Sequence, residues 1–297
     1  MEEIGQLIGK GFGIWKMNLN LCIPFICNLF ASILIVAAFF IAIFVAAIPF
    51  LGEDWTQLED LEGPGAMEDL FAGMGWQDLL PIIFLLLGMM AALSLVGSYF
   101  NAGAIGMARQ ALEEGRSRTS AMWSAGRKHF WNMFLLSLIM ALATMAGLIF
   151  LLPGIEQLGE ALSGNPDSLE GLGLILAGFL LFILYALVLS IILAPAPYAL
   201  VIEGLGPVAA IKAGLVFFRY NKFDVLILWL VVVALSLVLQ MIGSSFSMGE
   251  SDAFQPLSAI TTLVGLLVLA PLTNLWWTRL YMSRKGMIKE EEVKDLW

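Results

Sequence analysis

Six long apolar runs alternate along the chain with segments that hold most of its polar residues. The runs cover residues of about 21–50, 79–107, 131–153, 173–202, 224–243 and 257–282. A helix of about 20 apolar residues crosses the ~30 Å hydrocarbon core of a bilayer. None of the runs alternates apolar and polar residues as a barrel strand does. The pattern therefore predicts six transmembrane helices packed as a bundle.

Composition supports this class of protein. Hydrophobic residues make up 60% of the chain and charged residues 13%, whereas a soluble domain is about half apolar and a quarter charged. The first run is far longer than the apolar core of a cleavable signal peptide, so we interpret it as a retained span. We expect a single membrane domain over residues 1–297, ending in a charged cytoplasmic tail at 286–297.

Charge predicts how the chain is oriented. All 15 basic residues fall in the two terminal segments, in the loops after the second and fourth runs, or at the run ends that border them. The other three loops contain acidic residues and no basic one. Basic flanking loops stay on the cytoplasmic side. We therefore expect a protein of the cytoplasmic membrane with both termini in the cytoplasm.

The segments before the odd-numbered runs resemble one another. Gly11, Gly126 and Gly214 each have Ile or Trp three residues earlier and an aromatic residue four residues later. The dipeptide Glu-Gly precedes two of the copies, at Glu114 and Glu203. This pattern predicts three parallel two-helix repeats, of about 1–110, 111–202 and 203–285. Chance likeness between aromatic-rich membrane edges is the alternative.

Each of these segments is predicted to form an amphipathic elbow helix on the cytoplasmic side. Apolar residues follow a helical stripe in 2–17 and 206–222, and more weakly in 116–130. Such helices anchor spans at the headgroup level, bind a partner, or pack under the bundle. The residues predicted to contact lipid or a partner are Arg116, Arg118, Arg127, Lys128, Lys212, Arg219 and Lys222.

The interior of the predicted bundle is neutral, because no charged residue lies in the middle of a run. Amides and hydroxyls there either join helices by hydrogen bonds or line a ligand pocket. Prolines in the fourth and sixth runs predict bends, which either open a cavity or only tilt the helices. The candidate cavity or hinge residues are Gly106, Pro195, Pro197, Pro271, Asn28, Asn101 and Asn274.

The residue patterns that metal sites and common catalytic motifs require are absent from the sequence. The chain has one histidine, His129, and its two cysteines, Cys22 and Cys27, are spaced so that they face different sides of a helix. No nucleotide-binding, hydrolase or metalloprotease motif is present. We predict no enzyme activity, no cofactor, no metal site and no nucleic-acid partner. The acidic loop at 51–78 is predicted to be a solvated cap, with weak divalent-cation binding as the alternative.

The elbow pattern and the segment EGLGPVAAIKAG at 203–214 resemble a group of six-span prokaryotic membrane proteins. This group includes the membrane domain joined to some glycerophosphodiester phosphodiesterases and related stand-alone archaeal and bacterial proteins. The resemblance implies a membrane domain without catalytic residues, because no length remains for a soluble catalytic barrel.

Two functions follow from these features. The leading hypothesis is a non-enzymatic scaffold or accessory protein whose basic elbows engage membrane lipids or a protein partner at the cytoplasmic face. The alternative is a transporter for a small apolar or amphipathic molecule or a lipid. The proline breaks and the amides within the spans favour this alternative.

Overall fold

The structure, a computed structural model, describes residues 3–47, 76–155, 168–247 and 255–288, and every regular element in these ranges is helical. Six helices are long and apolar enough to cross a membrane, which confirms the predicted number of spans. They cover Leu19–Val45, Leu79–Glu114, Thr119–Ile155, Gly173–Glu203, Lys222–Ser244 and Ala259–Arg284. The protein is therefore a multi-pass helical membrane protein. The predicted acidic loops and most of the charged tail lie outside the described residues.

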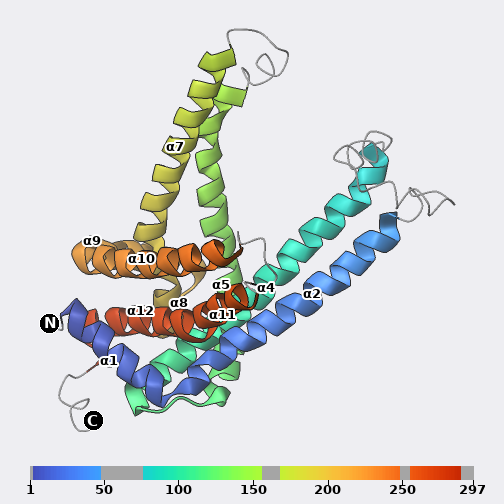
Figure 1. Cartoon of the computed structure of the whole chain (residues 1–297). Helices are drawn as coiled ribbons and strands as arrows, with labels where there is room; N and C mark the ends of the chain where they lie inside the picture. Colours follow the sequence, from blue (N-terminus) through green and yellow to red (C-terminus); the bar gives the residue numbers. More distant parts are fainter. Residues whose placement is uncertain (1–2, 48–75, 156–167, 248–254, 289–297) are drawn as a thin grey trace. The chain divides into compact units, whose positions relative to one another are not determined.

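Consecutive spans pair as helical hairpins (Figure 1). Helix α2 (Ile23–Ala47) pairs with α4 (Trp76–Glu114). Helix α5 (Thr119–Met145), extended by the 3-10 helix η4 (Ala146–Leu151), pairs with α7 (Ser168–Leu193). Helix α10 (Lys222–Ser247) pairs with α11 (Gln255–Val264). Glycines allow close approach in each pair: Gly88 faces Phe39, Gly147 faces Tyr185 and Gly243 faces Thr261.

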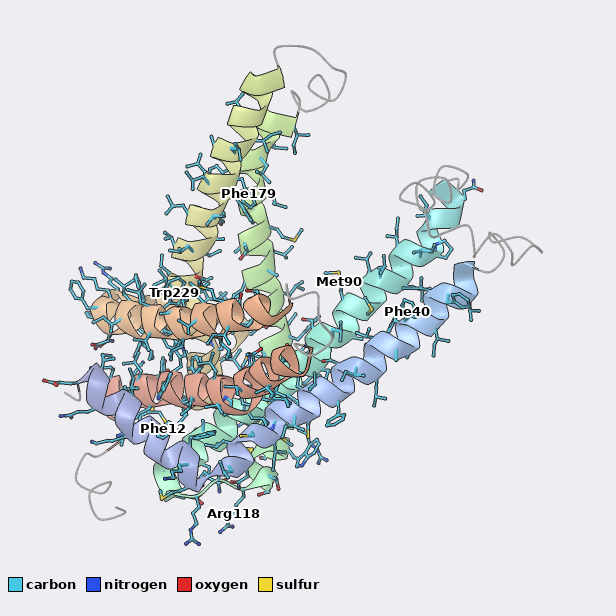
Figure 2. All side chains as sticks on the ribbon, viewed as in Figure 1. Phe12, Phe40, Met90, Arg118, Phe179 and Trp229 are labelled. Carbon is cyan, nitrogen blue, oxygen red and sulfur yellow. The ribbon has the colours of Figure 1, made fainter. Side chains whose placement is uncertain are left out.

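The chain divides into two compact units, residues 27–97 and residues 1–26 with 98–297. The first holds most of α2 and α4, and its large apolar side chains, such as Phe40 and Met90, are mostly exposed (Figure 2). The second holds the main buried core. We call the part of the second unit that forms this core the junction layer. It consists of α1 (Ile4–Met17), residues 98–133, α8 (Ala196–Glu203), α9 (Pro207–Tyr220) and α12 (Ala270–Arg284).

Three glycines set the packing of the junction layer. A Cβ built at Gly11 would lie 2.5 Å from the Trp276 ring, one at Gly126 would lie 2.9 Å from the Tyr99 ring, and one at Gly214 would lie 3.0 Å from the Ala196 Cα atom. Each glycine thus brings the segment before an odd-numbered span against the helix that ends an even-numbered span. We call these even-numbered end helices, α4, α8 and α12, the returning helices. The residues four before and three after each glycine are also buried, namely Leu7 and Ile14, Met122 and His129, and Ala210 and Phe217.

The three returning helices end in the same way. Gly115, Gly204 and Gly286 follow the ends of α4, α8 and α12 with φ of 73°, 70° and 68°, and they are the positive-φ residues of the described chain. Glycine adopts this left-handed conformation without steric cost and so ends the helices. The Glu-Gly dipeptides noted in the sequence mark two of these ends.

Polar contacts join the ends of neighbouring helices. Arg109 Nη1 on α4 donates to the Ile202 carbonyl of α8 at 3.0 Å. Glu203, at the end of α8, accepts from the Tyr281 hydroxyl at 2.5 Å and pairs with Lys285 at 2.9 Å. These contacts link α4 to α8 and α8 to the end of α12.

Helix α1 connects α12 with the segment that follows α4. The Trp276 indole of α12 donates to the Ile8 carbonyl of α1 at 3.2 Å. Asn18, just after α1, donates to the Gly115 carbonyl at 3.1 Å and accepts from the Ser117 amide at 2.9 Å. The first helix of the chain is therefore joined to α12 through Ile8 and to the segment after α4 through Asn18.

One predicted elbow differs from the other two. Helices α1 and α9 are separate because Asn18 and Asn221 end them, each amide donating to the carbonyl four residues earlier. The segment 116–130 forms no separate helix, since α5 continues from Thr119 to Met145. Its asparagine, Asn132, lies one residue earlier relative to the glycine than in the other copies. The prediction of three elbow helices is thus wrong for this copy.

Candidate functional site

A cavity of about 340 Å³ lies among the helices of the second unit. Polar side chains line it from all three returning helices, namely Asn101 on α4, Tyr198 on α8, and Thr273 with Asn274 on α12, and Ser236 adds a hydroxyl from α10. The other lining residues are Phe25, Val232, Gly265, Leu269 and Ala270. The wall thus combines neutral hydrogen-bonding groups with apolar ones, as small-molecule sites commonly do.

Asn274 is the most constrained polar group in this cavity. Its side chain is 7% exposed, and its Oδ1 atom has no hydrogen-bond partner in the described part of the chain. Tyr198 is held beside it by stacking, with its ring 6.1 Å from the ring of Trp277. Asn101 is exposed, so the cavity is open on the side of α4.

Helix irregularities shape the wall formed by the sixth span. A π-helix, η6 (Gly265–Leu269), precedes α12, and π-helical turns frequently occur at functional sites. Pro271 has no N–H to offer the carbonyl of Leu267 four residues earlier. That carbonyl accepts instead from the Cys22 thiol at 3.0 Å. The local sequence therefore opens the helix at the cavity without leaving this carbonyl unpaired.

Two of the three asparagines predicted to line a cavity do so, and the third lies elsewhere. Asn101 and Asn274 line the cavity together. Asn28 belongs to the other compact unit, where its Oδ1 atom is also buried without a described partner.

The helix-breaking candidates fall near the cavity-lining residues of the fourth and sixth spans. Pro195 caps α8 after α7 ends at Leu193, Pro197 lies in the first turn of α8, and Pro271 lies in the first turn of α12. At Gly106, in contrast, α4 continues unbroken. A side chain there would collide with Ala125 of α5, so this glycine allows close packing of the two helices.

The seven basic residues predicted to contact lipid or a partner are all exposed, and Figure 2 shows Arg118 extending away from the helices. On α5, Arg127 and Lys128 line a shallow depression together with Trp123, Ser120 and Ser124. These cations, hydroxyls and indole are the groups that meet phosphate headgroups at a membrane interface. The opposite side of the same turns is buried through Met122, Gly126 and His129.

The cations of α9 and α10 border a second, apolar hollow. This groove, of about 280 Å³, is lined by Val188, Ile191, Ile192, Phe218, Lys222, Phe223 and Leu226. Lys222 lies with its Nζ atom 5.4 Å from the centre of the Phe223 ring. Arg219 occupies the last turn of α9, where a cation interacts favourably with the helix dipole.

The arrangement offers no metal site among the described residues, where no three His, Cys, Asp or Glu side chains gather as a metal would need. Sequence reasoning missed Tyr198 and Ser236 as cavity residues. Tyr198 follows the proline break of the fourth run directly, so an aromatic hydroxyl beside a helix break is the signal that would have found it. Ser236 gives no such signal, and its hydroxyl donates to the Val232 carbonyl.

Comparison with known proteins gives two matches. A family model described as a domain of unknown function (DUF7847) matches residues 70–280. An uncharacterized protein of Archaeoglobus fulgidus is 24% identical over 295 residues, which is 95% of this chain and 96% of the archaeal protein. No solved structure matches the chain.

Proposed function

The chain belongs to the DUF7847 family, and we propose that it is a non-enzymatic membrane scaffold whose junction layer binds anionic lipid headgroups on the cytoplasmic side. One observation carries the proposal: all seven basic residues are exposed beside buried helix faces. Arg116 and Arg118 lie in the segment between α4 and α5, the other five lie on α5, α9 and α10, and the opposite faces of α5 and α9 are buried. A rigid support that presents cations at the membrane edge favours anionic headgroups, each lysine or arginine near the surface contributing about 1 kcal/mol.

The charge distribution supports the cytoplasmic placement. Basic residues flank the junction-layer ends of the spans, and the loops at the other ends contain carboxylates but no cation. Retention of basic segments in the cytoplasm would place both termini and the basic side of the junction layer at the cytoplasmic face. The anionic inner leaflet would then face the basic surface directly.

The proposed scaffold is built from three parallel repeats. The glycine contacts at Gly11, Gly126 and Gly214 support this proposal, because each has a buried residue at the same two spacings. The helix-ending glycines Gly115 and Gly204 support it as well. In this arrangement each repeat would place one patch of cations on the cytoplasmic surface.

The likeness to membrane domains joined to glycerophosphodiester phosphodiesterases is part of the proposal and concerns the membrane region alone. It assigns no catalytic residue to this chain. A cytoplasmic protein partner is the other occupant that the basic surface would suit.

The lipids around the purified protein, reconstituted in bilayers, test the headgroup proposal. Spin-labelled phosphatidylglycerol should associate with the protein several-fold more strongly than spin-labelled phosphatidylcholine. Replacing Arg116, Arg118, Arg127, Lys212 and Arg219 by glutamine should remove most of this preference.

The variant Glu114→Gln is the control, because it alters the same exposed surface while removing a negative charge. It should keep or increase the preference for the anionic lipid. Equal preference in the wild type and in the fivefold variant would refute headgroup binding by these residues.

A second candidate function is a carrier for a small amphipathic molecule, favoured by the cavity to which all three returning helices contribute. Flux of labelled lipids and metabolites into liposomes tests it. The carrier would be discarded if no class of compound crossed faster with the protein than without it.

A further inference from the structure

The cavity is lined by Asn274, whose side-chain oxygen is a hydrogen-bond acceptor without a donor among the described residues. Asn274 Oδ1 is buried and unpaired among the described residues, although its side chain lines a space of about 340 Å³. Buried amide oxygens are nearly always hydrogen-bonded in folded proteins. A group that enters the cavity and donates one hydrogen bond to this atom would complete its bonding.

The lining also determines the charge of that group. No charged side chain lines the cavity among the described residues. An ion at this depth would need a counter-charge or extensive hydrogen bonding. The lining therefore selects a neutral donor, and hydroxyls or amides of the ligand have further partners in Asn101, Tyr198 and Thr273.

The remaining walls select an apolar attachment to that donor. Phe25, Val232 and Leu269 line the same space as the polar groups. Asn101 at the α4 side is exposed, so the cavity connects with the surface of the second unit. In a membrane-spanning protein the surface at such a span is covered by lipid chains, which gives an amphiphile direct entry.

We propose that this cavity binds a neutral lipid alcohol, whose free hydroxyl donates to Asn274 Oδ1 while its chains leave along the apolar wall. The inference deepens the carrier candidate by naming its ligand class. It concerns binding alone and does not require that the ligand crosses the bilayer.

Binding to the full-length protein in phosphatidylcholine nanodiscs tests the proposal. The probes are dioleoylglycerol with a free hydroxyl and the same lipid with that hydroxyl acetylated, which removes the donor. The free alcohol should bind about tenfold more tightly, as expected for one buried hydrogen bond. Oleyl alcohol serves as a third probe, and binding of it alone would restrict the ligand to single-chain alcohols.

The variant Asn274→Leu should abolish the preference for the free hydroxyl while apolar binding remains. Gln240→Leu is the matched control, since Gln240 is an exposed amide on α10 outside the cavity; it should leave the preference unchanged. The proposal would be overturned if the two dioleoylglycerols bound the wild type equally tightly, or if none of the three probes bound.

A photoreactive dioleoylglycerol covers the case in which Asn274→Leu does not fold. Its cross-links to the wild-type protein should map to Phe25, Val232 or Leu269 and be displaced by excess free alcohol. Cross-links confined to other residues would also overturn the proposal. None of these results depends on anionic headgroups or on flux, so failure here is separate from failure of either proposed function.

Discussion

The junction layer and the part of the α5–α7 hairpin beyond residue 133 belong to the same compact unit but differ in how they use apolar residues. Leu200 in the junction layer is 0% exposed, whereas Leu184 on α7 is 57% exposed. The junction layer also has the polar links through Arg109, Glu203 and Trp276. The hairpin has Phe179 pointing outward (Figure 2) and packs mainly through the glycine contacts of its own two helices.

This difference indicates that the hairpin is surrounded by lipid, whereas the junction layer is surrounded mainly by other helices of the protein. Exposed leucine and phenylalanine are stable where lipid replaces water, so the hairpin needs little tertiary packing. Lipid provides no hydrophobic drive between helices, and close packing with polar contacts must supply the association. The junction layer concentrates both, and it therefore fixes the ends of the spans relative to one another within its unit.

The largest expected effect comes from filling a glycine contact of the junction layer. Gly214→Leu would place a side chain against the backbone of Ala196, which cannot move aside as a flexible side chain would. We expect a loss of about 3 kcal/mol in the free energy of unfolding. Denaturation in detergent, followed by tryptophan fluorescence, measures it.

Gly13→Leu is the control for this substitution, because nothing lies within 4 Å of a Cβ at Gly13 on α1. It should leave stability unchanged or raise it by up to about 1 kcal/mol through better helix propensity. Similar losses of unfolding free energy in both variants would show that the contact between α9 and α8 is no more important for stability than an open position on α1.

A charge on the hairpin should have the next largest effect. Leu180 is 68% exposed, a position where aspartate is harmless in water but costs about 2.5 kcal/mol in a bilayer. Leu180→Asp should therefore reduce the fraction of chains inserted in microsomal membranes. Tyr220→Asp, at an 81% exposed residue at the end of α9, should insert normally, and equal insertion of both variants would contradict a lipid environment for the hairpin.

A smaller effect is expected from the polar link between α8 and α12. Tyr281→Phe removes the hydroxyl that donates to Glu203 at 2.5 Å but keeps the ring stacked on Phe217. Lys285 continues to pair with Glu203, so we expect a loss of about 1 kcal/mol in unfolding free energy. Thermal unfolding in detergent measures it, with Tyr220→Phe as the control that should not change; a stability equal to the wild type would exclude a role for this bond.

Much of the fold was predictable from the sequence because apolar length alone defines spans. The helical stripe around Gly11 includes Leu7, which is buried, but the stripe predicted around Gly214 is not the buried face of α9. Val208 and Leu215 of that stripe are exposed, and the buried residues of α9 are Ala210, Gly214 and Phe217. The continuous α5 was not predicted, since the position of one asparagine relative to Gly126 decides whether the helix ends.

The candidate site was predictable in part. Asn28, Asn101 and Asn274 were chosen because amides within spans either join helices or line a pocket, and Asn101 and Asn274 line one cavity. The π-helix and the bond from Cys22 to Leu267 depend on how the first and sixth spans meet. Contacts between spans distant in sequence leave no periodic pattern along either one, so sequence reasoning had no access to them.

The side of the membrane on which the junction layer lies is the most direct test of the account. Single cysteines at Arg118 and Thr56, in a chain with Cys22→Ser and Cys27→Ser, are exposed to an impermeant maleimide in inverted and in right-side-out vesicles. We predict that Arg118→Cys reacts only in inverted vesicles and Thr56→Cys only in right-side-out ones. Reaction of both cysteines from the same side would contradict the account.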